Sequence, residues 1–323
     1  MRIFTLGDIK HDTFIEVPDA SLLCKKQDTS CSMAFAYGEK IPVGAFFSQF
    51  AGTAPNVAIG LTRLGHHAGV LSSLGTDYDA ERALNFLREH HIDTEYISQK
   101  KHHRMTHAVV LNFRGESTQL VAHNDTKHTL PKKLPVPDLL HISEMSNGYR
   151  SVFADILAYQ KKNKLSLSIN PGVVQIKERS KELFALIKVS KVLFVNIKEA
   201  ALLTKLSPSL SPKTLLTALL ALGPHTAVMT DGGKGAYAAH QGRSLFAPVF
   251  PAVRKEATGA GDAFSAGVLG ALLHDHSLAE ALAWGAVNGA SVVEYIGPTA
   301  GLLSARDIAK RLSDHESYRV RIL

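Results

Sequence analysis

Residues 257–264 combine two glycines with a carboxylate at the point where an apolar helical pattern begins. Glycines at a helix start expose backbone amides that have no partner within the helix, beside the positive end of the helix dipole. Such amides can bind a phosphoryl group on which negative charge develops. Asp262 would lie in the first helical turn, where its carboxylate can accept a proton from an attacking hydroxyl group. The segment therefore indicates either a phosphoryl-transfer centre or an ordinary N-capped helix.

Three further segments carry residues that suit the same chemistry. Asn56 follows Gly52 at the start of a predicted helix, where its amide can hold a hydroxylated ligand or only cap the helix. Asn196 and Glu199 follow a predicted strand and share one face of the next turn, where they can hold the waters of a magnesium ion or only form a cap. Residues 230–235 form a glycine-rich turn whose bare backbone can approach nucleotide phosphates or simply reverse the chain.

The order and combination of these four segments resemble the ribokinase (pfkB) family of carbohydrate and nucleoside kinases, and the resemblance covers essentially the whole chain. It implies that Asp262 is the catalytic base and that the turn of Gly259, Ala260 and Gly261 is the anion hole. It also implies two cofactors, ATP and Mg²⁺. Residues 291–299 and a long lid insertion look closer to archaeal-type nucleoside kinases than to bacterial ribokinases.

The same resemblance assigns the remaining candidate site residues. The expected magnesium residues are Asn196 and Glu199. The expected nucleotide contacts are Asn196, Thr230, Gly232, Gly235 and, near the adenine, Asn288. The expected substrate contacts are Asp12, Gly52, Asn56 and Glu144.

The chain departs from the family pattern at three places. Ala51 precedes Gly52 where paired glycines are usual, so the backbone should fit the ligand less closely. Glu256 and Ala257 replace residues that help to form a potassium-binding loop in many members, which leaves a monovalent cation uncertain. Ser168 stands where the first residue of an Asp-x-Asn pair is usual.

The predicted elements can position these residues. Apolar runs at 2–6, 139–142, 165–169 and 192–195 alternate with helical patterns, which is typical of a parallel sheet with helices on both faces. Short alternating pieces between 13 and 49, and a hairpin formed by 105–112 and 117–122, indicate a second, small sheet. We therefore expect a three-layer α/β/α domain of residues 1–12, 48–96 and 122–323, with a β lid of residues 13–47 and 97–121.

Composition limits the class of protein further. The chain has 323 residues, of which 45% are hydrophobic and 20% charged, as in an ordinary globular protein. Its net charge of +7 is spread along the chain, so we expect no nucleic-acid partner. No apolar run is long enough for a membrane span and no signal peptide is evident, which predicts a cytoplasmic protein without a membrane partner.

Cysteine and histidine spacings predict little further chemistry. Cys24 and Cys31 have neither a metal nor a redox spacing, and we expect reduced thiols. His103 and His107 lie in a strand-like stretch too extended for both to bind one metal ion, and we expect most histidines to be ordinary surface residues.

The predicted function is transfer of the γ-phosphate of ATP to the hydroxymethyl group of a furanose sugar. A nucleoside acceptor such as adenosine is the alternative, and a non-catalytic ligand-binding homologue is a third reading. A dinucleotide-binding fingerprint is missing from the sequence, and residues 233–235 do not fit a P-loop. Family members are often dimers joined through their lids, so a homodimer is a further expectation.

Overall fold

A computed structural model describes residues 1–24, 31–101, 103–122 and 127–323 of the chain. The strands, in chain order, are β1 (Arg2–Leu6), β2 (Lys10–Glu16), β3 (Ser21–Cys24), β4 (Cys31–Ala34), β5 (Phe46–Ala51), β6 (His67–Leu74), β7 (Ile97–Gln99), β8 (Thr106–Phe113), β9 (Glu116–Ala122), β10 (Leu139–Ile142), β11 (Leu167–Ile169), β12 (Val192–Asn196), β13 (Thr226–Thr230), β14 (Ala236–His240), β15 (Arg243–Ala247) and β16 (Arg321–Ile322). The helices are α1 (Thr53–Arg63), α2 (Tyr78–Glu89), α3 (Tyr149–Asn163), α4 (Val173–Glu178), α5 (Lys181–Val189), α6 (Ile197–Thr204), α7 (Pro212–Leu220), α8 (Ala260–Leu273), α9 (Leu278–Val292) and α10 (Ala305–Ser313), with a 3₁₀ turn η1 at Gly232–Lys234.

The larger sheet has the strand order β16-β15-β14-β13-β12-β11-β10-β1-β6-β7. All neighbours from β7 to β13 pair in parallel, and β14, β15 and β16 extend one edge in antiparallel fashion. A parallel sheet covered on both faces needs apolar side chains on both faces. The continuous burial of β10 and of Ile3–Leu6 in β1 meets that need.

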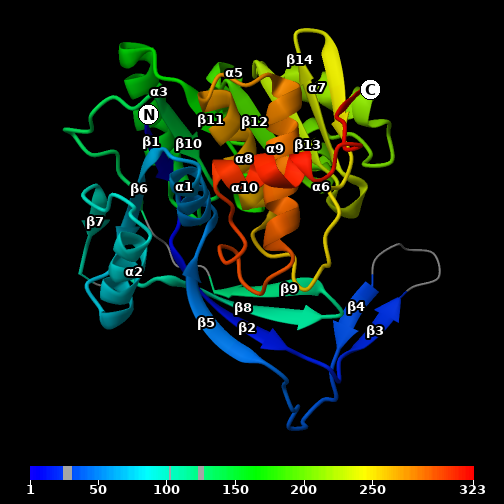
Figure 1. The fold of residues 1–323 in the computed structure, drawn as a ribbon. Coiled ribbons are helices and arrows are strands. Elements are labelled where there is room, and N and C mark those ends of the chain that lie inside the picture. The colour runs from blue at the N-terminus through cyan, green and yellow to red at the C-terminus, as the bar shows by residue number, and fades with distance from the viewer. Residues whose placement is uncertain (25–30, 102, 123–126) are drawn as a thin grey trace.

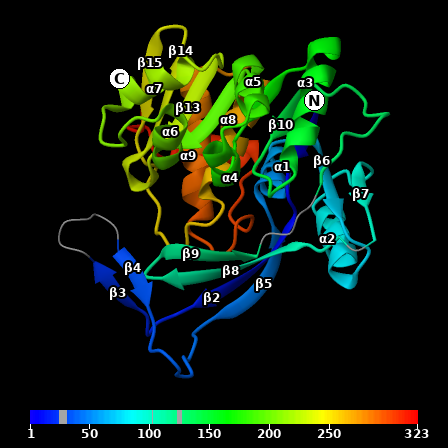
Figure 2. The same cartoon turned by 180° about the vertical axis from the view of Figure 1, so that it is seen from behind.

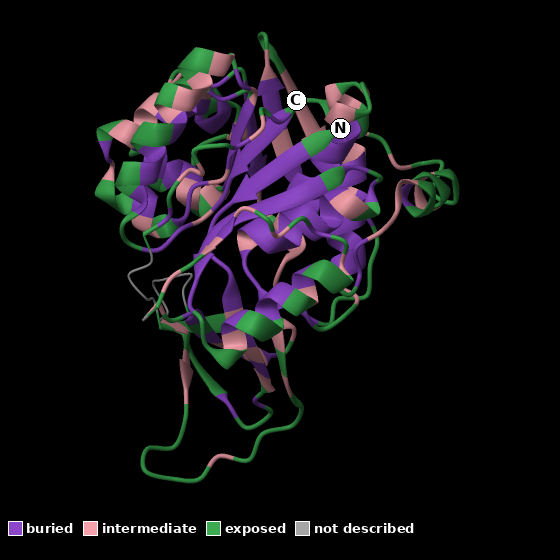
Figure 3. Ribbon diagram, turned by 90° about the vertical axis from the view of Figure 1, so that its left-hand side faces the viewer, coloured by how far each residue is buried: buried purple, intermediate pink, exposed green. Residues whose placement is uncertain are grey.

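Helices cover both faces of this sheet, as Figures 1 and 2 show from opposite sides. One apolar core lies against α1, α2, α8, α9 and α10, and a second lies against α3 to α7. The central strands are buried while the outer helix surfaces are exposed (Figure 3). The predicted α/β fold, with a mostly parallel central sheet between two helical layers, is therefore confirmed.

A separate four-stranded sheet has the order β5-β2-β8-β9 and lies beside one end of the larger sheet (Figure 1). Its central strands β2 and β8 are parallel, and β5 and β9 flank them in antiparallel fashion. The predicted hairpin is confirmed as β8 and β9. Arg114 and Gly115 make its turn with φ angles of 51° and 79°, in the left-handed region typical of a two-residue hairpin.

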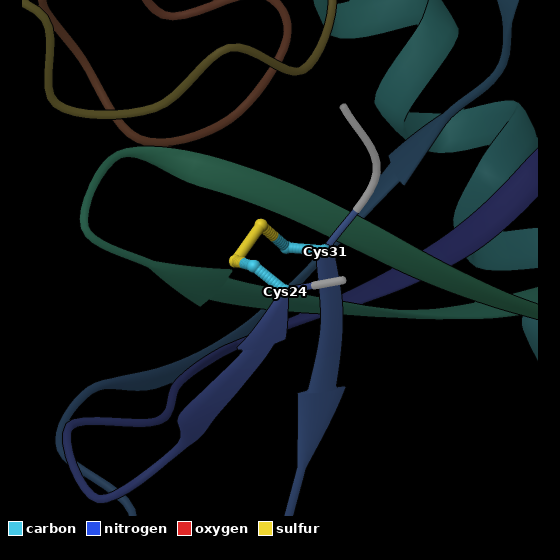
Figure 4. Close-up of a disulfide and its surroundings, with 2 residues drawn as sticks. All are labelled: Cys24 and Cys31. Carbon is cyan, nitrogen blue, oxygen red and sulfur yellow. A yellow bond between two sulfur atoms is a disulfide. The ribbon is translucent and has the colours of Figure 1, made fainter. Parts of the chain in front are cut away.

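The expectation of two reduced thiols is wrong. Cys24 and Cys31 form a disulfide that joins the ends of β3 and β4 (Figure 4). The two residues are direct partners in the antiparallel pairing of these strands, which brings their side chains together. Because the pairing depends on strand register, the seven-residue separation could not reveal it.

Within the described residues, no helix has both the length and the apolar character needed to cross a membrane.

Candidate active site

Helix α8 begins at the glycine-rich turn that the sequence singled out. Gly259 is its N-cap with a φ of 81°, and a side chain there would collide with Pro298. Gly261 faces open space, so a ligand can approach the amides of the first turn. The N–H of Ala260 already donates to the carbonyl oxygen of Ala257, at 3.2 Å. The structure therefore presents the first-turn amides of α8, with Gly261 the most open of the turn.

Asn56 and Asp262 meet between two helices that are far apart in the sequence. Asn56 lies in the first turn of α1, is 4% exposed, and its Nδ2 donates to Asp262 Oδ2 at 2.7 Å. Gly52, the N-cap of α1, has a φ of 123° and passes so close to the carbonyl oxygen of Asp8 that a side chain would not fit. Glycine at this position therefore lets α1 begin next to the strand that carries Asp12.

The surroundings of Asp262 raise its pKa to about 6. Burial is the main cause, and the nearby carboxylate of Glu144 acts in the same direction. Hydrogen bonds from Asn56 and Thr53 and the charge of Lys10 lower the pKa and limit the shift. The carboxylate is thus ionised at neutral pH yet basic enough to accept a proton.

Asp12 lies on β2 and is only 5% exposed. Burial, and after it the negative charges of Asp262, Glu144 and Glu256, raise the pKa of Asp12 to about 6. The positive charge of Lys10 acts in the opposite direction. Its Oδ1 has no hydrogen-bond partner among the described residues, and the same holds for Asn56 Oδ1. Buried acceptors without partners are costly, and a bound ligand with hydroxyl groups would satisfy both. Both atoms are therefore available as acceptors for a ligand's hydrogen-bond donors.

Lys10 is a buried cation at this site that the sequence analysis missed. Its Nζ lies 3.2 Å from Glu144 Oε2, and the side chain is 9% exposed. Burial alone would lower the pKa of Lys10, but the carboxylates of Glu144, Asp8 and Asp12 raise it above its ordinary value. The sequence did carry a signal for Lys10. Side chains alternate along a strand, so Lys10 lies on the same face of β2 as Asp12.

Asp8 is the second residue that the sequence analysis missed. It is 4% exposed and accepts hydrogen bonds from the Ser146 amide at 2.7 Å and, through Oδ1, pairs with His128 Nε2 at 2.6 Å. Burial would raise the pKa of Asp8, yet His128, Lys10 and the Ser146 amide hold it below its usual value. Asp8 thereby fixes the chain between β1 and β2, and with it the position of Asp12.

A polar cavity of about 200 Å³ opens next to Asp262. Its lining residues are Thr53, Glu144, Asn170, Pro171, Gly172, Phe194, Val195, Asn196, Glu199, Thr230, Gly261, Asp262 and Ser265. The predicted magnesium residues and the predicted base therefore lie on one cavity.

Asn196 and Glu199 form a reciprocal cap at the start of α6. Asn196 Oδ1 accepts from the Glu199 amide at 2.9 Å, and Glu199 Oε2 accepts from the Asn196 amide at 2.8 Å. Burial, with the charges of Glu144 and Asp262, raises the pKa of Glu199 to about 7. The cap holds the carboxylate in place, and its neighbours make its negative charge costly unless a cation binds.

A second, mostly apolar cavity of about 280 Å³ adjoins the first and shares Thr230 and Gly261 with it. Its walls include Phe250, Phe264 and Val293, and its lining also contains the predicted glycines Gly232 and Gly235. Gly235 has a φ of 110° and lies against the Ala247 carbonyl, so only glycine suits this turn. An apolar cavity joined to a polar one fits a molecule with a flat ring system and a charged tail.

Asn288 lies behind the wall of this cavity instead of lining it. The residue is fully buried on α9, where its Nδ2 donates to the Ala263 carbonyl at 2.8 Å and its Oδ1 accepts from the Leu303 amide at 3.0 Å. Gly289 and Val293 of the same helix do line the cavity. Asn288 therefore contributes by joining α8 to α9.

Ser168, the first of two departures from the family pattern that have a structural partner, lies on β11. It is paired with His141 on β10, whose Nδ1 lies 2.9 Å from the serine oxygen. Burial lowers the pKa of His141 to about 3, so a neutral hydroxyl partner suits a neutral imidazole.

Glu256 is the second departure, and it joins the four-stranded sheet to the loop before α8. Its Oε1 accepts from Ser117 of β9 at 2.5 Å and from the Thr258 amide at 2.6 Å, while Oε2 accepts from the Gly297 amide at 3.4 Å. Both oxygens are thus engaged by the protein in a fully buried position.

The cleft brings a helix N-terminus and a carboxylate together in an α/β fold, an arrangement that suits phosphotransferases. A family model described as pfkB family carbohydrate kinase matches residues 26–305. That match spans most of the chain. The protein therefore belongs to the pfkB family of carbohydrate kinases.

Individual relatives agree with this assignment. Ribokinase from Haemophilus influenzae is 25% identical over 256 residues, which cover 77% of this chain and 82% of the relative. The solved nucleoside kinase of Methanocaldococcus jannaschii, an archaeal member of the ribokinase family, is similar with a TM-score of 0.75, 20% identity and coverage of 97% and 98%. An Escherichia coli protein described as a putative ribokinase II, solved with ATP and Mg²⁺, gives a TM-score of 0.73, 18% identity and coverage of 97% and 99%.

The raised pKa of Asp262 predicts that this carboxylate destabilises the fold at neutral pH. Folding raises the pKa from 3.8 to about 6, so stability that is present below about pH 4 is lost as pH rises through 6. Asp262→Asn should remove this electrostatic penalty and so raise the free energy of unfolding at neutral pH by about 1–3 kcal/mol. We expect calorimetry at pH 8 to show a Tm about 2–6 °C above wild type.

The difference between the two proteins should shrink towards zero near pH 4, where Asp262 is protonated. Asp155→Asn, a matched change at an exposed position on α3, should leave Tm unchanged. A Tm for Asp262→Asn at or below wild type at pH 8 would contradict the electrostatic account.

Proposed function

We propose that this protein transfers the γ-phosphate of ATP to the hydroxymethyl group of a furanose sugar. The observation that carries the proposal is the position of Asp262. Its carboxylate lies in the first turn of α8, beside exposed helix amides, and lines a cavity that also contains Glu199. A base, an anion hole and a cation site at one point are the parts that phosphoryl transfer requires.

In the proposed reaction, the hydroxymethyl oxygen of the substrate attacks the γ-phosphorus of ATP. An oxygen–phosphorus bond forms, the bond from the γ-phosphorus to the ADP oxygen breaks, and the hydroxyl proton passes to Asp262. The turn of Gly259, Ala260 and Gly261, with the N-terminus of α8, stabilises the negative charge on the transferred group. The hydrogen bond from Asn56 holds the accepting carboxylate in position.

The residues around the polar cavity fit Mg²⁺. Glu199, Glu144 and Asp262 offer the oxygen ligands or water contacts that this ion prefers. Burial and, to a lesser extent, the negative charges of Glu144 and Asp262 raise the pKa of Glu199 to about 7. We propose that Glu199, positioned by Asn196, holds the ion. When bound, Mg²⁺ neutralises charge on the phosphate oxygens.

ATP would occupy the two joined cavities. We propose that the adenine lies in the apolar cavity, among Phe250, Phe264 and Val293, and that the phosphates pass Thr230 towards Gly261. The glycines at 232 and 235 let the backbone approach the nucleotide. A monovalent cation is not part of the proposal, because both oxygens of Glu256 are held by protein donors.

The acceptor would lie between the larger sheet and the four-stranded sheet. Asp12 Oδ1 and Asn56 Oδ1 supply acceptors for ring hydroxyls, and Glu144 is held nearby by Lys10. A nucleoside carries the same furanose and hydroxymethyl group, and the structural likeness to a nucleoside kinase supports it as the alternative acceptor.

We propose that residues 13–47 and 97–121 act as a lid over the acceptor. Two contacts support this role. Ser117 of β9 donates to Glu256, and Glu116 of β9 pairs with Arg254 at 2.8 Å. A closed lid would exclude water from the transferred phosphoryl group and so favour the sugar hydroxyl as acceptor.

The test is ADP release from ATP-Mg over a panel of acceptors comprising ribose, fructose, other sugars, adenosine, inosine and cytidine. We expect turnover with a furanose sugar, and Asp262→Asn should lower kcat by at least about 100-fold while ATP still binds, because the variant loses only the proton acceptor. Turnover with nucleosides alone would select the alternative.

Equal kcat in Asp262→Asn and wild type would exclude Asp262 as the base. ATP binding without turnover on any acceptor would favour a binding protein that kept only the fold. Asp155→Asn serves as the matched control for an aspartate outside the cleft.

We also propose a homodimer formed through the lid. The lid, including its strands β3 and β4, exposes several large apolar side chains, namely Leu22, Leu23, Phe35, Tyr37, Val43, Phe46 and Leu120. Exposed apolar side chains on sheets favour association. Light scattering should give twice the chain mass, and replacing Leu23 and Phe46 by serine should give a monomer; a monomeric wild type would exclude the dimer.

A further inference from the structure

Two histidines and an aspartate meet on the side of the four-stranded sheet that faces away from the cleft. His11 Nδ1 lies 3.7 Å and His107 Nε2 lies 3.9 Å from Asp79 Oδ2. One potential ligand atom of each residue lies within 4.8 Å of those of the other two. Because strand side chains alternate, His11 points away from the face that carries Lys10 and Asp12.

Strand pairing and a helix start bring the three residues together. β2 and β8 are parallel neighbours, and His11 and His107 are direct partners in their register. Asp79 lies in the first turn of α2, a helix that packs in the core of the larger domain. The cluster therefore joins both central strands of the small sheet to a helix of the other layer.

His11 is the member whose surroundings call for a ligand. Its side chain is only 14% exposed, and neither ring nitrogen has a hydrogen-bond partner among the described residues. The ring is fixed by stacking on Phe50, at 4.9 Å between centroids and 27° between planes. An imidazole with neither nitrogen hydrogen-bonded in a largely buried position is costly, and a bound ion would use the lone pair of the unprotonated nitrogen.

The surroundings of His11 favour its neutral, metal-binding form. Burial, followed by the neighbouring His107 and Arg82, lowers the pKa of His11 below its ordinary 6.5 despite the opposing charge of Asp79. Arg82 contacts the other carboxylate oxygen, with Nη1 3.3 Å from Asp79 Oδ1. That contact orients Asp79 so that Oδ2 faces the two rings.

We propose that His11, Asp79 and His107 bind a divalent transition-metal ion of the Zn²⁺ class. Two imidazoles and one carboxylate are a common ligand set for this ion, with a fourth position left to water. Tetrahedral ligands at about 2.0–2.1 Å from zinc lie about 3.3 Å from each other, so small side-chain rotations close the present distances. His107, at 52% exposure, gives the ion a route from solvent.

The bound ion would connect the small sheet to α2 on the side opposite the cleft. His11 adjoins Asp12, the proposed substrate contact, in the same strand. Fixing β2 against α2 would therefore restrain the strand that carries Asp12, and the ion would stabilise the folded protein because the unfolded chain does not assemble its ligands.

The test is a Zn²⁺ titration of tag-free, metal-stripped protein with its disulfide intact, in competition with a chromophoric chelator. We expect one tight equivalent in wild type. Asp79→Asn and His107→Ala should each weaken binding at least tenfold, since even loss of an outer-shell partner costs 10–100-fold. Co²⁺ should give a visible absorption band in wild type that is lost in both variants.

Three control variants locate the ion. Glu81→Gln changes an exposed carboxylate near Asp79 in sequence, and His67→Ala changes an exposed histidine outside the cluster; both should bind Zn²⁺ like wild type. Glu199→Gln tests for binding in the cleft. The proposal is overturned if wild type shows no stoichiometric binding, if Glu199→Gln loses the equivalent while Asp79→Asn keeps it, or if the two exposed-site variants weaken binding as much as His107→Ala.

Discussion

The hydrogen bond from Asn56 to Asp262 is the contact on which the arrangement of the cleft depends. It joins the first turns of α1 and α8, two segments that are 206 residues apart in the chain. Each helix begins at a glycine with positive φ, Gly52 and Gly259, which lets its N-terminus approach neighbouring backbone closely. The bond thus places the proposed base between the proposed substrate contact Asn56 and the exposed amides of α8.

The cost of this arrangement is electrostatic. Asp12, Glu199 and Asp262 all have pKa values raised to between about 6 and 7, with burial as the first cause in each case. Lys10 and the hydrogen-bond donors around them offset part of this cost. The remainder destabilises the folded protein, and binding of a cation and a hydroxylated ligand would relieve it.

Local patterns in the sequence were enough to predict much of the fold. The strands at 2–6 and 139–142 were predicted with the bounds that the structure shows, because buried parallel strands read as uninterrupted apolar runs. The short strands β7, β15 and β16 and the short helix α4 were not predicted, since such short segments depend on their tertiary neighbours.

The candidate site was predictable where function depends on backbone conformation. The glycine turn before α8 and the pair at Asn196 and Glu199 carry signals within a few residues. The direction in which Asn288 points, the disulfide, and the meeting of His11 with Asp79 depend on register and helix rotation, which one sequence does not encode locally.

The most direct test of the central contact is the pH dependence of kcat/KM in Asn56→Ala. The hydrogen bond lowers the pKa of Asp262, so its loss should raise that pKa and move the acidic limb from about pH 6 upward by about one unit, the equivalent of about 1.4 kcal/mol. A general loss of substrate binding would lower the whole profile without moving its midpoint. An acidic limb at the wild-type pH in Asn56→Ala would contradict the account.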